Sequence, residues 1–255
     1  MIEWSKLTDR EIDALDRRLP VVLPVGLIEA HGPHLESGFD SYSADWFARR
    51  LCEEAGAILL PPIPYGFADT NWEYAATLGV KAETLGLVIG DLCKMLCHHG
   101  FKRILALSGH GGNSVGATLG FQQAWEKYPD MKPLLWTYFT TGGVPMSHAD
   151  EKETALALAI GGVVHMDRAE DFQLKKPWHE VYSRKALAPR SGGVNGRPSQ
   201  ATLAMGEEIR DKLLSTLVDK LKAIVAQETA GQIPIQVVST GGRGGYLGGV
   251  NVRPR

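Results

Sequence analysis

An alternation of short apolar runs with longer segments of helical periodicity is the feature that most constrains how this chain can fold. The apolar runs resemble buried strands and occupy residues 18–26, 57–66, 102–108 and 133–139. The segments with apolar residues at helical spacing occupy residues 43–56, 84–100, 113–128, 151–162 and 199–227. A capping box formed by Thr8 and Glu11 opens a further helix that we expect to end at about Arg18. The alternation predicts an α/β fold with a mostly parallel sheet that helices cover on both faces.

The composition argues against nucleic acid or a membrane as the partner. The chain has 255 residues, of which 44% are apolar, and its formal net charge is −2, so no basic field is available to hold nucleic acid. No apolar run approaches the length of about 18 residues that a membrane span needs, and the N-terminus does not resemble a signal peptide. Cys52, Cys93 and Cys97 form no CxxC pair and are typical of buried free thiols. We therefore expect a cytoplasmic protein.

The C-terminal residues 239–255 differ in composition from the rest of the chain. They are rich in glycine and contain three arginines and no acidic residue. We therefore expect a single domain over residues 1–238, followed by a tail over residues 239–255. The tail is either loosely docked or packed as an arm on a neighbouring subunit.

The stretch GLIEAHGPHLESGFDSYSAD, residues 26–45, directly follows the first apolar run and is crowded with acids and histidines. Glu29 and His31 are two residues apart, so in an extended segment both side chains face the same way. Asp40 follows after enough chain to fold back, and its carboxylate could bridge two metal ions. Imidazole and carboxylate ligands suit Zn²⁺, Mn²⁺, Fe²⁺ or Co²⁺. The alternative is an ordinary polar loop that caps the following helix.

Two further clusters follow later strands, at the sheet edge where ligands bind in parallel α/β folds. SGHGGN, residues 108–113, presents His110 among glycines, although a phosphate-binding nest or a tight turn would also explain it. It has neither P-loop nor GxGxxG spacing, which argues against a nucleotide. SHADEKET, residues 147–154, places His148 and three acids at a helix start, where helix capping is the alternative explanation.

These three clusters together resemble the creatininase (creatinine amidohydrolase) family. LPVGLIEAHGPHLESGFD, residues 23–40, resembles the family pattern PxGxxExHGPHLPLxTD. SGHGGN resembles its NGHGGN, and SHADEKETA resembles its HAGExETS. The resemblance extends from about residue 18 to residue 228, with the motifs in the family's order.

The resemblance implies a three-layer α/β/α sandwich and a hydrolase with two divalent metal ions per subunit, Zn and/or Mn, with Fe as a further possibility. It also implies a homo-oligomer, often a hexamer. By position, Glu29, His31, Asp40 and His110 match the family's metal ligands, with Asp40 as the bridging carboxylate. His148 matches the catalytic histidine.

The fifth metal ligand requires a substitution. Creatininase has a glutamate two residues after the histidine that matches His110, and Gly112 occupies that position here. Because glycine has no side chain to offer, we expect Glu151 to supply the missing carboxylate. Glu153 is the alternative ligand.

The surroundings of the motifs depart from the family, which makes creatinine itself an unexpected substrate. The departures are Glu36, Ser37, Phe39, Ser108, Asp150, and Asn71, which stands where many members have histidine. We expect a metal-bridging hydroxide to hydrolyse a cyclic amide or related C–N bond of a small molecule, with His148 as the proton shuttle. Expected substrate contacts are Asn71, Trp72, Tyr74, Gly111, Gly112 and Asn113. The alternatives are a ring-opening C–C hydrolase of an oxidised cyclitol, a deformylase or a peptidase on the same site, or a non-catalytic metal-binding scaffold.

Overall fold

Five parallel strands form one sheet in the part of the chain that this computed structural model describes, residues 1–68, 70–174 and 191–229. The strand order across the sheet is β1-β3-β2-β4-β5. The strands are β1 (Ile2–Glu3), β2 (Val21–Val25), β3 (Ile58–Leu59), β4 (Arg103–Ser108) and β5 (Lys132–Thr137). All neighbouring pairs run parallel, so every carboxyl end lies at the same edge of the sheet.

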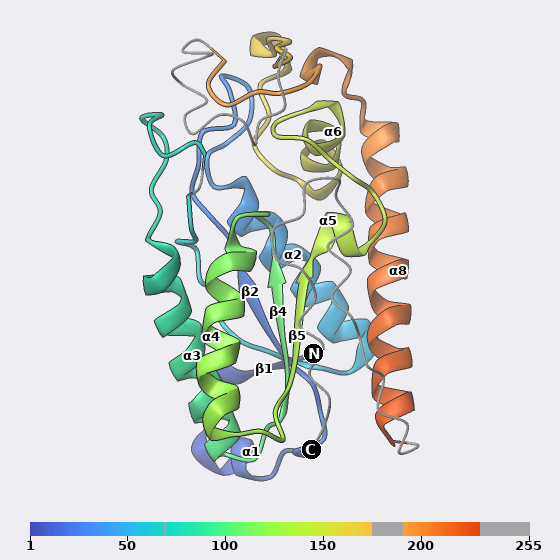
Figure 1. Cartoon of the computed structure of the whole chain (residues 1–255). Helices are drawn as coiled ribbons and strands as arrows, with labels where there is room; N and C mark the ends of the chain where they lie inside the picture. The colour runs from blue at the N-terminus through green and yellow to red at the C-terminus, as the bar shows by residue number, and fades with distance from the viewer. Residues whose placement is uncertain (69, 175–190, 230–255) are drawn as a thin grey trace.

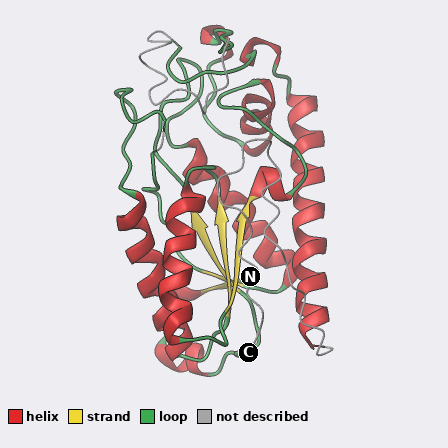
Figure 2. Ribbon diagram, in the orientation of Figure 1, coloured by secondary structure: helices red, strands yellow, loops and turns green. Residues whose placement is uncertain are grey.

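Helices cover both faces of this sheet (Figure 1). On one face lie α3 (Ala82–His98) and α4 (Asn113–Lys127), and on the other lie α2 (Phe39–Ala55) and α8 (Leu203–Thr229). The shorter helices are α1 (Asp9–Asp13), α5 (Tyr138–Thr141) and α6 (Glu151–Ile160), with single 3-10 turns at Trp4–Lys6, Met166–Arg168 and Pro198–Gln200. Figure 2 shows the strands pointing toward a layer of loops that lies beyond their carboxyl ends.

Two apolar cores hold the three layers together. Successive residues of a strand point to opposite faces, so Val21 and Leu23 pack with α3 and α4, whereas Val22 packs with α2 and α8. The same alternation holds in β4. Both faces of the strands are therefore apolar, which is why each strand appears in the sequence as a continuous apolar run. The structure confirms the predicted three-layer α/β/α sandwich.

The strand order places a topological switch point between β2 and β4. The chain leaves β2 through α2 toward β3 on one side, and it leaves β4 through α4 toward β5 on the other side. Since β2 and β4 are neighbours, the loops that follow them diverge, and ligands bind at such a switch point in open α/β sheets. Two of the three clusters found in the sequence lie on these loops.

Some element boundaries differ from expectation. The first helix ends at Asp13 instead of about Arg18, because the Arg17 guanidinium donates to the carbonyls of Ile12 and Leu15 and closes the chain into a turn. The last predicted strand ends at Thr137, and α5 begins at Tyr138. The edge strand β1 was not expected.

The three cysteines are buried and free, as predicted. Within the described ranges, the structure contains no helix with the length and apolar character needed to cross a membrane. The expected tail, residues 239–255, lies outside the described residues.

Candidate metal centre

Acidic and histidine side chains from four segments meet beyond the carboxyl ends of β2 and β4. Glu29 and His31 come from the loop after β2, Asp40 from the first turn of α2, and His110 from the loop after β4. His148 precedes α6, and Glu153 lies in its first turn. Their nitrogen and oxygen atoms form three overlapping groups, in each of which all atoms lie within 4.8 Å of one another.

The carboxylate of Asp40 joins two halves of this cluster. Its Oδ2 lies 3.3 Å from His110 Nδ1, which in turn lies 2.9 Å from Glu29 Oε1. Its Oδ1 lies 3.4 Å from His31 Nε2, which in turn lies 3.8 Å from Glu153 Oε1. Asp40 therefore presents one oxygen to each half, and each half contains two carboxylates and one imidazole.

The cluster is buried and its polar atoms are incompletely bonded. The side chains of Glu29, His31, Asp40 and Glu153 are at most 6% exposed. Glu29 Oε1, His31 Nε2 and Asp40 Oδ2 have no hydrogen-bond partner among the described residues. Buried polar atoms without partners are costly, and metal ligation is one arrangement that satisfies them. The donor set therefore fits divalent cations.

Positive charge already balances the acids where imidazoles contact them. Burial alone would raise the pKa of Glu29, but His148 and His110 hold it below the usual value. Burial alone would lower the pKa of His31, but Asp40 and Glu153 raise it well above the usual value. At Glu153 burial dominates and raises the pKa of the carboxyl. A bound cation would supply positive charge in place of these protons.

The loop after β2 fixes the orientation of His31. The Glu29 amide donates to the Ser37 carbonyl at 2.8 Å, which closes the loop. His31 Nδ1 lies 3.1 Å from the Glu29 carbonyl oxygen, and a carbonyl only accepts, so Nδ1 carries the hydrogen. Nε2 of His31 is thereby left facing Asp40 and Glu153, where its lone pair would be available to a metal ion that takes the place of the proton.

A close backbone contact explains why residue 109, the first glycine of SGHGGN, has no side chain. Gly109 lies against the backbone of Asp40, and a Cβ at this position would overlap the Asp40 carbonyl group. This close approach brings the end of β4 to the start of α2. It therefore sets the distance between His110 and Asp40.

His148 faces the same half of the cluster as Glu29. Its Nδ1 lies 3.4 Å from Glu29 Oε1, and its ring lies 4.4 Å from that of His31, centroid to centroid. The following residue, Ala149, has a left-handed backbone with φ of 48°. This turn directs the Ala149 amide to Glu153 Oε2 at 2.5 Å, so one local conformation links His148 to Glu153.

The structure places Glu153 in the cluster and Glu151 outside it. Glu151 is the first residue of α6, and its Oε2 accepts a hydrogen bond from the Arg197 amide at 2.9 Å. Asp150 caps the helix by accepting from the amides of Lys152 and Glu153. Residues two apart in a helix point to nearly opposite sides, so Glu151 and Glu153 cannot both face the cluster. The geometry favours the alternative ligand, Glu153, over the expected Glu151.

The glycine-rich loop provides both an open surface and a structural link. Gly111 is exposed and Gly112 is half-buried, beside His110. Asn113 is fully buried, and its Nδ2 donates to the Gly26 carbonyl while its Oδ1 accepts from the Phe67 amide. Both ends of the Asn113 amide are therefore hydrogen-bonded, and Asn113 links the glycine-rich loop to the segments that contain Gly26 and Phe67.

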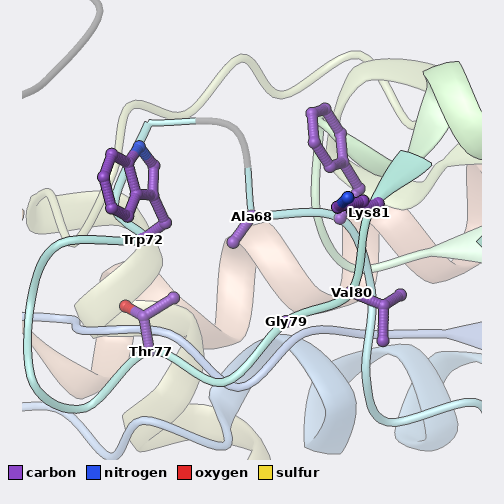
Figure 3. A pocket seen from close by; sticks show the side chains of 7 residues that line it. Ala68, Trp72, Thr77, Gly79, Val80 and Lys81 are labelled. Carbon is purple, nitrogen blue, oxygen red and sulfur yellow. The ribbon is translucent and has the colours of Figure 1, made fainter. Parts of the chain in front are cut away.

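The three other expected substrate contacts have different environments. Asn71 is buried and bonded to Glu29 and His148. Tyr74 is buried, with its hydroxyl 2.9 Å from Ser191 Oγ. Trp72 is 59% exposed and lines a pocket of about 280 Å³, opposite Lys81 in the view of Figure 3. The remaining lining residues are Phe67, Ala68, Thr77, Gly79 and Val80.

Some residues at the site were not singled out in the sequence. Thr77 Oγ1 accepts from the Ala30 amide at 3.1 Å, and Ala30 in turn contacts His148. Gly193 has φ of 97°, and a Cβ there would lie 3.1 Å from His148 Nε2. The adjacent pair Gly192–Gly193 was the available signal for such a close approach. Thr77 carried no such signal.

Comparisons with known proteins give a consistent result. The family model for creatininase, described as creatinine amidohydrolase, matches residues 5–221. The creatinine amidohydrolase of Pseudomonas putida is 23% identical over 229 residues, covering 79% of this chain and 88% of that protein. The mycofactocin precursor peptide peptidase of Mycolicibacterium smegmatis is 28% identical over 238 residues, covering 84% and 88%. The 3-dehydro-scyllo-inosose hydrolase of Thermotoga maritima is 27% identical over 249 residues, covering 84% and 80%.

Solved structures share the fold. A mutant creatininase complexed with creatine has a TM-score of 0.80 at 23% identity and covers 88% of this chain and 98% of its own. A Zn-Zn type mutant creatininase has a TM-score of 0.78 at 23% identity, with coverage of 89% and 97%. A structure described as creatininase Mn has a TM-score of 0.79 at 24% identity, with coverage of 89% and 98%.

Proposed function

The chain belongs to the creatininase family of hydrolases, and from this premise we propose that it hydrolyses a C–N bond of a small cyclic amide or related molecule with two divalent metal ions. The observation that carries the proposal is the placement of Asp40. Its two oxygens face two separate sets of buried donors, at 3.3 Å from His110 and 3.4 Å from His31. A single carboxylate shared in this way suits a pair of metal ions.

Each half of the cluster would hold one ion. Glu29 Oε1, Asp40 Oδ2 and His110 Nδ1 form the first half, and His31 Nε2, Asp40 Oδ1 and Glu153 Oε1 form the second half. Mixed nitrogen and oxygen donors suit Zn²⁺ and Mn²⁺, and also Fe²⁺. The Zn-Zn and Mn structures of creatininase support the same choice of metals.

The chain's own residues would bind the ions and move the proton. Divalent ions supply a nucleophile at neutral pH by lowering the pKa of water from about 15.7 toward about 7, and they polarise a carbonyl group. His148 Nδ1 points to the first half, 3.4 Å from Glu29 Oε1, where it can take a proton from the attacking water. A new C–O bond forms, the C–N bond breaks, and His148 returns the proton to the leaving nitrogen.

The substrate differs from creatinine in this proposal. Asn71, which replaces a histidine of many members, is buried against Glu29 and His148, and Trp72 and Lys81 line the pocket of about 280 Å³. No residue of the metal cluster lines this pocket, so it would take only a part of the substrate that extends away from the scissile bond. A second candidate is ring opening of an oxidised cyclitol, favoured by the 27% identity to the inosose hydrolase.

A cytoplasmic location and a homo-oligomer, as a hexamer, belong to the same proposal. Support for self-association comes from α3 and α4, which expose the large apolar side chains Leu87, Met95, Leu119 and Trp125. Light scattering after size-exclusion chromatography measures the oligomeric state, and a monomer at micromolar concentration would contradict that part of the proposal.

The test of the proposed function combines metal analysis with a substrate panel. Protein purified without chelator or metal-affinity resin is expected to contain about two ions per chain and to hydrolyse a member of a panel of cyclic amides, formamides, peptides and oxidised cyclitols. Asp40→Asn should lose both ions and activity. Asp45→Asn, five residues further along α2 and paired with Arg49, is the matched control and should keep both. Absence of bound metal after incubation with Zn²⁺ and Mn²⁺ would contradict the proposed function and leave a non-catalytic scaffold that keeps the motifs without their metal chemistry.

A further inference from the structure

Asn71 connects two side chains of the first half of the cluster. It is 1% exposed, and its Nδ2 lies 2.9 Å from Glu29 Oε2 and 2.9 Å from His148 Nε2. Glu29 lies 42 positions before Asn71 in the chain, and His148 lies 77 positions after it. One buried amide group therefore contacts a carboxylate and an imidazole from two other segments.

The contact with Asn71 gives the two Glu29 oxygens different partners. Oε2 accepts the hydrogen bond from Asn71, and Oε1 lies 2.9 Å from His110 Nδ1 within the cluster. Oε1 has no hydrogen-bond partner among the described residues. Since Oε2 is held by the amide, Glu29 presents a single oxygen to a metal.

The contact with Asn71 also fixes which way His148 faces. His148 Nε2 lies 2.9 Å from Asn71 Nδ2 and 2.8 Å from the Ala30 carbonyl oxygen, so Nδ1 is turned toward Glu29. A carbonyl only accepts and an amide nitrogen only donates, so the two contacts belong to the two neutral tautomers of the ring. Asn71 favours the tautomer with the hydrogen on Nδ1, whereas Ala30 favours the one with the hydrogen on Nε2, which leaves Nδ1 free to accept the proton of the attacking water. Both keep the same ring orientation.

We propose that Asn71 is a positioning residue whose amide holds Glu29 as a one-oxygen ligand and keeps His148 Nδ1 directed at the metal centre. This inference rests on the proposed function for its metal-binding consequence. Residues that hydrogen-bond a metal ligand on the side away from the metal strengthen metal binding, and their removal typically lowers the affinity by about 10–100-fold. Asn71 contacts Glu29 of the first half and no ligand of the second half by the hydrogen bonds of its Nδ2. The effect of its removal should therefore fall on one ion.

The test uses Asn71→Leu, which keeps the branched shape of the side chain, is somewhat larger, and removes the amide. Asn71→Ser, too short to reach either partner, is a second variant in case leucine prevents folding. Asn195→Ala is the matched control, because the Asn195 amide donates to Ser147 Oγ at 2.8 Å close to His148 without contacting Glu29. Affinities for Zn²⁺ come from competition with a chromophoric chelator, and ¹⁵N shifts of the His148 ring in metal-free protein report its tautomer.

We expect the Asn71 variants to weaken one of the two Zn²⁺ affinities by about 10–100-fold and leave the other within about threefold. Their His148 signals should shift toward the tautomer with hydrogen on Nε2, because the donor of Asn71 is lost from Nε2 while the Ala30 carbonyl, an acceptor, stays beside it. Asn195→Ala should match the wild type in both measurements. Unchanged affinities together with unchanged His148 signals would overturn the inference, as would an equal effect of Asn195→Ala. If the wild type binds no Zn²⁺, the proposed function fails, and the His148 shift in metal-free protein still decides the role of Asn71.

Discussion

Glu151 and Glu153 lie two residues apart in α6 and reach different parts of the molecule. Glu151 Oε2 accepts from the Arg197 amide at 2.9 Å, whereas Glu153 Oε1 lies 3.8 Å from His31 Nε2. Gly112, in the loop after β4, has no side chain to bind a metal. The second carboxylate of the half formed with His31 therefore comes from α6, the helix that follows His148, and not from the loop after β4.

Replacing Glu153 should remove one metal ion. Glu153→Gln keeps the size of the side chain and lowers its charge, so the half formed with His31 loses one of its carboxylates. We expect metal content to fall from about two ions per chain to about one, as measured by elemental mass spectrometry. Glu151→Gln is the matched control in the same helix turn and should retain both ions. The opposite pattern, with loss only in Glu151→Gln, would restore Glu151 as the ligand.

Replacing His148 should reduce the rate and preserve the metal. The ring faces Glu29 from outside the two ligand sets that share Asp40, so His148→Ala removes proton transfer and leaves those sets intact. General acid–base catalysis contributes about 10²–10⁴-fold, and a fall of that size in kcat is expected with two ions still bound. His165→Ala removes an exposed imidazole and serves as the control. Loss of metal in His148→Ala equal to that in Asp40→Asn would make His148 a ligand.

Acid should weaken the fold through His34. This side chain is buried, with Nε2 2.9 Å from Thr154 Oγ1, and burial together with the nearby His31 lowers its pKa to about 4. Between the unfolded pKa of about 6.5 and the folded value of about 4, the unfolded chain binds a proton that the folded chain does not, so stability is lost as the pH falls through that window. The full shift corresponds to about 3 kcal/mol, and we expect about 1–2 kcal/mol after solvent screening.

His34→Gln isolates this contribution, because glutamine can bond Thr154 without titrating. The free energy of unfolding of metal-free protein is measured by urea denaturation at pH 7.5 and pH 4.5. The stability advantage of wild type over His34→Gln should shrink by about 1–2 kcal/mol at the lower pH. His98→Gln, at the exposed end of α3, controls for removal of an imidazole. An identical pH dependence in wild type and His34→Gln would show that His34 does not titrate in this way.

The layers of the fold were predictable because they depend on local patterns. The apolar runs marked β2 and β4 because both faces of these strands are buried, and the spacing of apolar residues marked α2, α3 and α4. The structure also brings Glu29, His31, Asp40 and His110 together at the carboxyl ends of neighbouring strands, where parallel topology directs such loops.

The remaining features depend on contacts that no local pattern encodes. Choosing Glu153 over Glu151 requires the exact rotation of α6, which the Asp150 cap determines. Asn71 was expected to face a substrate, yet its partners lie 42 and 77 positions away and become visible only when the loops are placed together. Trp72, its neighbour in sequence, points instead to the pocket of Figure 3.

Two glycines of one motif should differ sharply in their tolerance of a side chain. A Cβ on Gly109 would overlap the carbonyl group of Asp40, whereas a Cβ on Gly111 has no atom within 4 Å. Gly109→Ala must push the end of β4 away from the start of α2, so it should lower the free energy of unfolding by about 1–3 kcal/mol, as overpacking does. It should also weaken metal binding, because the distance between His110 and Asp40 increases. Gly111→Ala is the matched control and should change stability by less than about 0.5 kcal/mol. Urea denaturation and chelator competition measure both effects, and equal stability of the two variants would show that the close approach of Gly109 to Asp40 does not constrain the site.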